Sequence, residues 1–207
     1  MKRRESAELF SSGIKRFCYG LGKKVLIANI LGEAVDRIWE SDLAQIGPGV
    51  ALLGTVAYTL QIYYDFSGYS DMAIGLGRML GFRFRENFDL PYLSVSVREF
   101  WRRWHISLSS WFKEYVYIPR GGSRAGKLRT YSNLFIVFLL TGIWHGANYT
   151  FFFWGIYYAL FLILERAFYG RFMEKHRPIG HIYTLLVVAV EHALGHLLVF
   201  AEHAALF

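Results

Sequence analysis

The chain has 207 residues, of which 54% are hydrophobic and 18% aromatic, and its formal net charge is +7. This apolar content exceeds that of an ordinary soluble domain. The basic residues flank or interrupt apolar runs, so they suit anionic lipid headgroups better than nucleic acid. Cys18 is the single cysteine, which excludes an internal disulfide. The basic start, MKRRESAELF, has no apolar core of signal-peptide length behind it.

The first apolar segment lies between Lys15 and Trp39. From Val25 onward its apolar residues recur at roughly helical spacing among acidic and basic ones, which predicts an interfacial or half-buried helix rather than a spanning one. We expect Lys23 and Lys24 to anchor the basic end of this helix at headgroups. Binding of a substrate phosphate by the two lysines is the less favoured alternative.

A second helix is expected after Pro48, where an uncharged stretch runs to Tyr64 and is long enough to cross a locally thinned bilayer. It ends at Asp65. Asp65 and Asp71 border apolar segments, and each would either cap a helix end, which is slightly favoured, or orient a histidine. The glycines at 68, 75, 77 and 81 suit close packing between helices or a kinked entry into the membrane.

The third element is a helix over residues 96–118, which Ser96 and Glu99 start as an S-x-x-E capping box. An apolar stripe containing three tryptophans lies opposite a basic face, which predicts a helix that lies along the membrane interface. His105 falls at the edge of this stripe, where its side chain can look into a protein cavity. The stripe consists of Val97, Phe100, Trp101, Trp104, Leu108, Trp111, Phe112 and Tyr115.

The segment from Arg120 to Arg129 is a short loop with four positive charges. Pro119, Gly121 and Gly122 end the helix before it. By the positive-inside rule the loop is expected to face the cytoplasm. A phosphate-binding nest is the less favoured interpretation.

From Tyr131 to Leu164 the chain contains no Asp, Glu, Lys or Arg. This run exceeds the ~20 residues that one spanning helix needs, so it predicts two membrane helices or one broken helix, with the turn around His145 at membrane depth. An imidazole at that depth is costly unless it meets a partner or a water-filled cavity, which favours a functional role. The alternative is a histidine that is only hydrogen-bonded between packed helices.

Beyond Arg166 the chain becomes rich in histidine. His192 and His196 share a helix face at a spacing that can bind a metal, but H-A-L-G-H lacks the glutamate of the zinc-protease pattern, so no metal site is predicted. The stretch from Ile182 to Val190 alone is too short to span a bilayer, and Glu191 interrupts it.

Three long motifs resemble the membrane-bound O-acyltransferase family, in particular its bacterial branch that acetylates polysaccharides such as alginate. They are DFSGYSDMAIGLGRMLGF, ENFDLPYLSVSVREFWRRWHISLSSWFKEYVYIPRGG and NLFIVFLLTGIWHGANYTFFFWGIYYALFLILER, and the resemblance covers residues 17–166. It implies an all-α, polytopic membrane fold with transmembrane, re-entrant and interfacial helices. It also implies that His145 is the catalytic histidine and His105 its partner. The Gly-Gly loop after Pro119 favours acetyl transfer over the related transfer of D-alanine to teichoic acid.

The resemblance further implies a multi-pass enzyme of the bacterial inner membrane that binds no cofactor or metal. Its acyl donor would be acetyl-CoA or an acyl-carrier thioester. Its partners would be membrane lipid and either a polysaccharide acceptor or periplasmic acetyl-relay proteins. Binding of nucleic acid is not expected. Residues 1–207 are expected to form a single membrane-embedded domain. Family members have further helices before the equivalent of Lys15, and residues 189–207 diverge from the family, so we expect a fragment of the full domain.

The chemistry expected at His145 is general-base catalysis, in which a neutral imidazole takes the proton of a sugar hydroxyl as that hydroxyl attacks an acyl carbonyl. His105 would orient the acceptor, stabilise the oxyanion or share the proton. A covalent acyl-histidine remains open. Two other readings also remain: a proton-coupled transporter with Asp65 and Asp71 on the proton path, and an inactive fragment.

Overall fold

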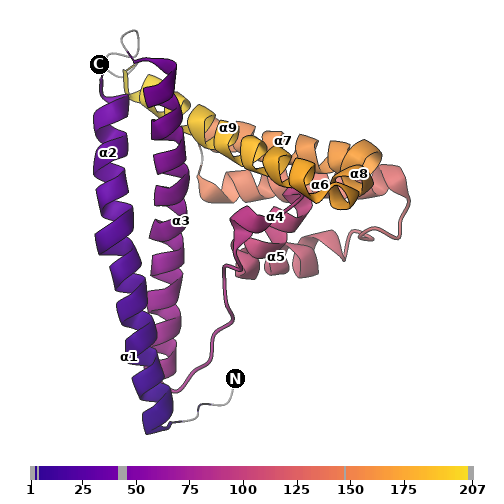
Figure 1. Ribbon diagram of the computed structural model, residues 1–207. Helices are drawn as coiled ribbons and strands as arrows, with labels where there is room; N and C mark the ends of the chain where they lie inside the picture. Colours follow the sequence, from indigo (N-terminus) through magenta and orange to yellow (C-terminus); the bar gives the residue numbers. More distant parts are fainter. Residues whose placement is uncertain (1–2, 4, 42–45, 147, 205–207) are drawn as a thin grey trace. The chain divides into compact units, whose positions relative to one another are not determined.

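The computed structural model describes residues 3, 5–41, 46–146 and 148–204, with side chains up to residue 195. All regular elements in these ranges are helical, as predicted (Figure 1). They are α1 (Ala7–Gly22), η1 (Lys23–Ala28), α2 (Asn29–Trp39), α3 (Pro48–Met79), η2 (Pro91–Leu93), α4 (Val97–Arg103), α5 (Ile106–Phe112), η3 (Lys113–Tyr117), α6 (Lys127–His145), α7 (Tyr149–Leu164), η4 (Glu165–Tyr169), α8 (Gly170–Lys175) and α9 (Arg177–Ala204). The chain forms two compact units, residues 1–87 and 88–207. This division does not test the expectation of a single domain.

In the first unit, α1, the π-helical turn η1 and α2 follow one another without a break and pack along α3 (Figure 1). Pro48 opens α3 at its first turn, where a missing N–H costs nothing. The prediction that this helix ends at Asp65 is wrong, because α3 continues for 32 residues to Met79. At 1.5 Å per residue its length is about 48 Å. Asp65 and Asp71 therefore lie inside α3 and do not cap a helix end.

Four glycines bring α1 and α3 into backbone contact. The helices run antiparallel, so Gly13 meets Gly75, and Gly20, seven residues later in α1, meets Gly68, seven residues earlier in α3. A β-carbon at Gly20 would lie 2.5 Å from the Gly68 carbonyl oxygen, and one at Gly13 would lie 2.7 Å from the Gly75 carbonyl oxygen. Only glycine permits this approach, which confirms the expectation of close helix packing.

Between the two glycine contacts, Asp71 accepts hydrogen bonds from two cations. Arg16 Nη2 lies 2.6 Å from Asp71 Oδ1, and Lys23 Nζ lies 2.7 Å from Asp71 Oδ2. The neighbouring pair joins Lys24 Nζ to Asp65 Oδ1 at 2.6 Å. The two lysines that were expected to anchor the helix at headgroups therefore bind carboxylates of α3. Each carboxylate is satisfied by a cation from a distant part of the chain, which allows an aspartate to stay inside an otherwise apolar helix.

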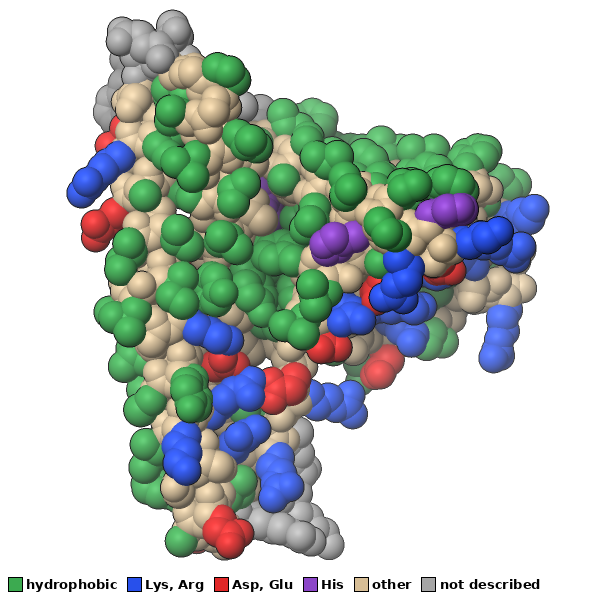
Figure 2. All heavy atoms as spheres, viewed as in Figure 1, with side chains coloured by type: hydrophobic (Ala, Val, Ile, Leu, Met, Phe, Trp, Pro, Cys, Tyr) green, Lys and Arg blue, Asp and Glu red, His purple; other side chains and the backbone are tan. Residues whose placement is uncertain are grey.

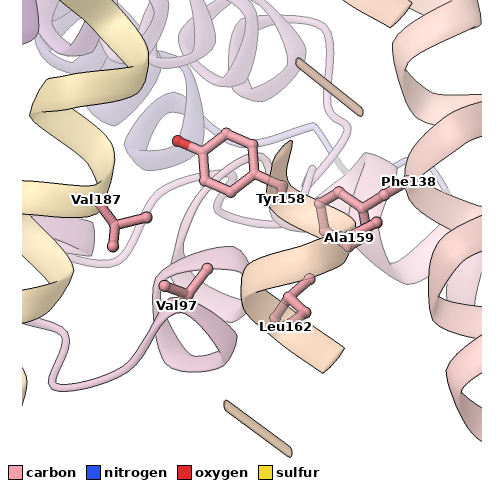
Figure 3. Packing of buried hydrophobic residues seen from close by; sticks show 6 residues of the cluster. All are labelled: Val97, Phe138, Tyr158, Ala159, Leu162 and Val187. Atoms are coloured by element: carbon pink, nitrogen blue, oxygen red, sulfur yellow. The ribbon is translucent and has the colours of Figure 1, made fainter. Parts of the chain in front are cut away.

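The second unit is built on the helix pair α6–α7. Gly142 and Gly155 lie where the two helices cross, against the carbonyl groups of Phe151 and Phe138. α9 packs on α7, and the core between them and α4 contains Val97, Phe138, Tyr158, Ala159, Leu162 and Val187 (Figure 3). The side chain of Tyr158 points toward α9, where its hydroxyl lies 3.1 Å from Glu191 Oε2. The prediction of two helices in residues 131–164 is thus confirmed.

The single helix predicted over residues 96–118 is wrong, because the chain breaks it at Trp104 and His105. α4 ends at Arg103, α5 begins at Ile106, and His105 between them has φ 45° in the left-handed region. The apolar spacing continues across the break, so periodicity did not reveal it. The predicted helix start is correct: the Ser96 hydroxyl accepts from the Glu99 N–H at 3.0 Å. The glutamate reaches back to the Val95 N–H at 2.9 Å.

Two helical stretches of the described chain are long and apolar enough to cross a bilayer, Tyr149–Lys175 and Arg177–Gly195. The stretch Ile182–Val190 alone is too short to span, but the second helix extends beyond it in both directions and includes Glu191. α3 and α6, which contain the other expected spans, fall short of the same mean hydropathy. In Figure 2 hydrophobic side chains cover long stretches of the visible surface, and charged side chains gather in separate patches.

Candidate active site

His105 owes its position to the break between α4 and α5. α4 is held on one side by ring contacts: Trp104 stacks on Phe100 with ring centroids 5.4 Å apart and meets Phe88 edge-on at 5.0 Å. Immediately after this packed tryptophan the backbone turns into the left-handed region at His105. A residue other than glycine seldom adopts this conformation, and such residues concentrate at functional sites.

His145 is the last residue of α6, directly before the turn into α7. Its ring lies among aromatic side chains: the centroid distances are 5.0 Å to Trp154 and 5.7 Å to Phe151, both on α7. Asn148 begins α7 by accepting a hydrogen bond from the Thr150 N–H at 3.2 Å. His145 is nevertheless exposed at the surface of the described chain. A substrate can therefore approach the imidazole at this turn.

Trp144 connects the two histidines. Its ring centroid lies 6.2 Å from that of His105 and 5.1 Å from that of His145. Burial and, to a lesser extent, the charge of nearby His145 lower the pKa of His105 to about 4. His105 is therefore neutral at physiological pH. The structure brings the two predicted site residues to one aromatic cluster, although they come from α6 and from the α4–α5 break.

This arrangement suits proton transfer and the stabilisation of an oxyanion. A neutral imidazole accepts a proton through one ring nitrogen and donates a hydrogen bond through the other. Two neutral imidazoles close together can divide these roles, one as the base and one as the donor. The rings of Phe151 and Trp154 cover one side of His145.

Other candidate residues take different roles. Asp65 and Asp71 belong to the first unit and bind Lys24, Arg16 and Lys23. His192 Nε2 lies 3.5 Å from Glu191 Oε2, whereas the side chain of His196 lies outside the described residues. Within the described part of the chain, no three residues of the metal-binding types are grouped.

Sequence reasoning missed Glu165. It directly follows the charge-free run, and only 4% of the residue is exposed. Its carboxylate accepts hydrogen bonds from the backbone N–H groups of Val97 and Arg98, at 2.8 and 3.3 Å. The one local signal for Glu165 in the sequence is its position as the first charged residue after a long apolar run. Nothing in the sequence indicates that it pairs with the start of α4.

Curated relatives of the chain are bacterial membrane acyltransferases. It is 49% identical over 189 residues to a probable alginate O-acetylase of Pseudomonas putida, covering 91% of this chain and 39% of the relative. It is 42% identical over 175 residues to a peptidoglycan O-acetyltransferase of Helicobacter pylori, covering 84% and 33% of the two chains. It is 28% identical over 200 residues to a teichoic acid D-alanyltransferase of Bacillus subtilis, covering 91% and 49%.

The chain spans about two fifths of the length of the alginate O-acetylases that it matches. The sequence profile of the membrane-bound O-acyltransferase family matches residues 1–177. This match extends beyond the 17–166 core on which the resemblance rested, and it includes both histidines, the break at His105 and the α6–α7 turn. The chain therefore belongs to the membrane-bound O-acyltransferase family.

Proposed function

We propose that this chain carries the acyl-transfer site of a membrane O-acetyltransferase that acetylates hydroxyl groups of an exported or cell-surface polysaccharide. The observation that carries the proposal is the convergence of His145 and His105 on Trp144. The greater identity to an alginate O-acetylase, 49%, than to a teichoic acid D-alanyltransferase, 28%, supports acetyl transfer and an alginate-like acceptor.

In the proposed reaction His145 acts as the general base. The acceptor oxygen forms a bond to the carbonyl carbon of a thioester while its proton passes to the imidazole. His105, neutral because of its low pKa, donates a hydrogen bond to the oxyanion that forms. When the intermediate collapses, the carbon–sulfur bond breaks and the thiolate leaves with the proton from His145. Acetyl ester and free thiol are the products, and both histidines return to their starting state.

The proposed donor is acetyl-CoA or an acetylated carrier protein, because a thiolate leaves more readily than an alkoxide. The acceptor is the polysaccharide itself or a periplasmic protein that relays the acetyl group to it. The protein lies in the bacterial inner membrane and crosses it several times. α4 and α5 lie along the interface, because a membrane-spanning position would place the charges of Arg102, Arg103 and Lys113 in hydrocarbon. The turn at His145 lies at membrane depth.

The test is histidine replacement in the complete product of the gene, with acetyl transfer measured in membranes of the producing cell. His145→Ala is expected to lower kcat by about 10²–10⁴-fold while the amount of protein in the membrane stays normal. His105→Ala is expected to be severely impaired, and the double variant to be little worse than His145→Ala, because residues that act as one unit do not add.

His176→Ala is the matched control. The His176 ring lies at the end of α8, where it contacts the Phe172 carbonyl oxygen at 3.0 Å and the Phe172 ring. This variant should keep full activity. Normal activity per molecule in His145→Ala would exclude His145 as the base. A loss of protein without a loss of activity per molecule would show that the two histidines only pack.

A further inference from the structure

Glu165 is a carboxylate buried in the second unit, and its partners all belong to the start of α4. It stands at the end of α7, where the helix loosens into the π-helical turn η4. Oε2 accepts from the Val97 N–H at 2.8 Å, and Oε1 accepts from the Arg98 N–H at 3.3 Å. The Ser96 side chain also hydrogen-bonds to it. A charge this deeply buried is costly unless such partners satisfy it.

Together with the capping box, Glu165 satisfies the N–H groups of the first three residues of α4. The first N–H groups of a helix have no partner within the helix. Here Val97 and Arg98 donate to Glu165, and Glu99 donates to Ser96. The negative carboxylate also lies at the positive end of the helix dipole. α4 is thus attached at its start to α7, which lies next to α6 and packs against it.

The side chain of Trp101 packs the middle of α4 against α6 and α7: it meets Tyr158 at a centroid distance of 4.8 Å, Phe138 at 5.3 Å and Trp154 at 5.4 Å. At the other end of α4 the Asp89 N–H donates to the Arg103 carbonyl oxygen at 2.9 Å. Hydrogen bonds from two consecutive N–H groups to one carboxylate are directional. They hold the start of α4 in position along its axis and in rotation.

His105 follows α4 directly, only two helical turns from Val97. A shift of α4 therefore moves the His105 ring relative to His145, which is carried by α6. We propose that Glu165 is a positioning residue of the acyl-transfer site: by holding the start of α4 it fixes the place of His105 relative to His145. This inference rests on the proposed function, because it assigns Glu165 a role through the two histidines.

The experiment compares Glu165→Ala and Glu165→Gln with Glu174→Gln in the complete gene product, with kcat, KM for the thioester and membrane protein level all measured. Glu165→Ala is expected to lower kcat by about 10²-fold, the cost of a misplacement of about 1 Å, with KM within about threefold. Glu165→Gln keeps one acceptor oxygen and should lose less. Glu174 pairs with the Arg98 side chain from the surface of α8, so Glu174→Gln removes a nearby charge without touching the α4 backbone and should stay fully active.

A second readout separates positioning from general stability. In a His105→Ala background, Glu165→Ala should cause no further loss of kcat, because the side chain that it positions is absent. An equal fold-loss in both backgrounds, or unchanged kcat in Glu165→Ala, would overturn the inference. If Glu165→Ala does not accumulate, the Glu165→Gln variant carries the same comparison. The proposed function fails separately, when His145→Ala itself remains active.

Discussion

The glycine contacts between α1 and α3 make a quantitative prediction for Gly20→Ala. The added β-carbon would lie 2.5 Å from the Gly68 carbonyl oxygen and 2.7 Å from the Met72 nitrogen, whereas ordinary contact begins near 3.4 Å. Both are backbone atoms and cannot rotate away, so the two helices must separate by roughly 1 Å. Overpacking of this kind costs about 1–3 kcal/mol. The separation also stretches the bonds from Arg16 and Lys23 to Asp71.

Gly22→Ala is the matched control in the same helix. A β-carbon at Gly22 meets nothing within 4 Å, and its backbone is already helical at φ −58°. Replacing a helical glycine with alanine in open space gains about 0.8–1 kcal/mol. The same gain applies at Gly20, so the two variants should differ by the overpacking cost of about 1–3 kcal/mol although they make the same chemical change two residues apart.

The assay is thermal unfolding of the purified protein in mild detergent, followed by circular dichroism. A difference of 1 kcal/mol shifts Tm by about 2–4 °C in a protein of this size. Gly20→Ala should melt at or below the parent protein and Gly22→Ala at or above it, with the two separated by about 2–12 °C. Equal melting temperatures would show that α1 and α3 do not approach as closely as described.

Three further predictions concern the second unit. Burial alone would raise the pKa of Glu99, but the Val95 N–H and the Arg103 guanidinium lower it below 4.5. The ionised Glu99 carboxylate therefore stabilises the folded protein above about pH 4.5, and this stabilisation is lost as the pH falls through the lower pKa of the folded state. Glu99→Gln should therefore make stability less dependent on pH in acid unfolding measured by fluorescence. Asn133→Ala removes the amide that donates to the Gly122 carbonyl oxygen at 3.2 Å, so it should cost about 1–2 kcal/mol and speed tryptic cleavage of the loop. A cysteine placed at Ser123 should resist a membrane-impermeant reagent in intact cells, because the positive-inside rule predicts that the basic loop faces the cytoplasm.

Each of these predictions has its own control or contrary outcome. Glu114→Gln removes an exposed carboxylate from η3 and should leave the acid-unfolding curve unchanged. Ser132→Ala alters an exposed neighbour of Asn133 and should not change tryptic cleavage. Labelling of the cysteine at position 123 from outside intact cells would place the loop on the opposite side of the membrane.

Local chemistry predicted several features of the fold. Ser96 and Pro48 begin helices where expected, because a cap and a helix-compatible φ are decided within one turn. The pair of helices around His145 followed from the length of the apolar run. The meeting of the two histidines was expected only from the family resemblance, since nothing in the spacing of residues 105 and 145 indicates proximity.

The errors came from partners far away in the sequence. Asp65 and Asp71 looked like helix ends because an unpaired carboxylate is unfavourable within an apolar helix. Their cations lie 41 to 55 residues earlier, so α3 continues past both. Glu165 was missed for the same reason, because its partners on α4 lie 67 and 68 residues before it. Short-range patterns do not reveal such compensation.

The left-handed backbone at His105 gives this position two competing requirements. The conformation favours glycine, and a residue with a β-carbon pays about 1–2 kcal/mol for it. Glycine at this position would therefore relax the backbone, but it would delete the imidazole. In the proposed reaction the same position must hold an imidazole, so stability and catalysis make opposite demands on it.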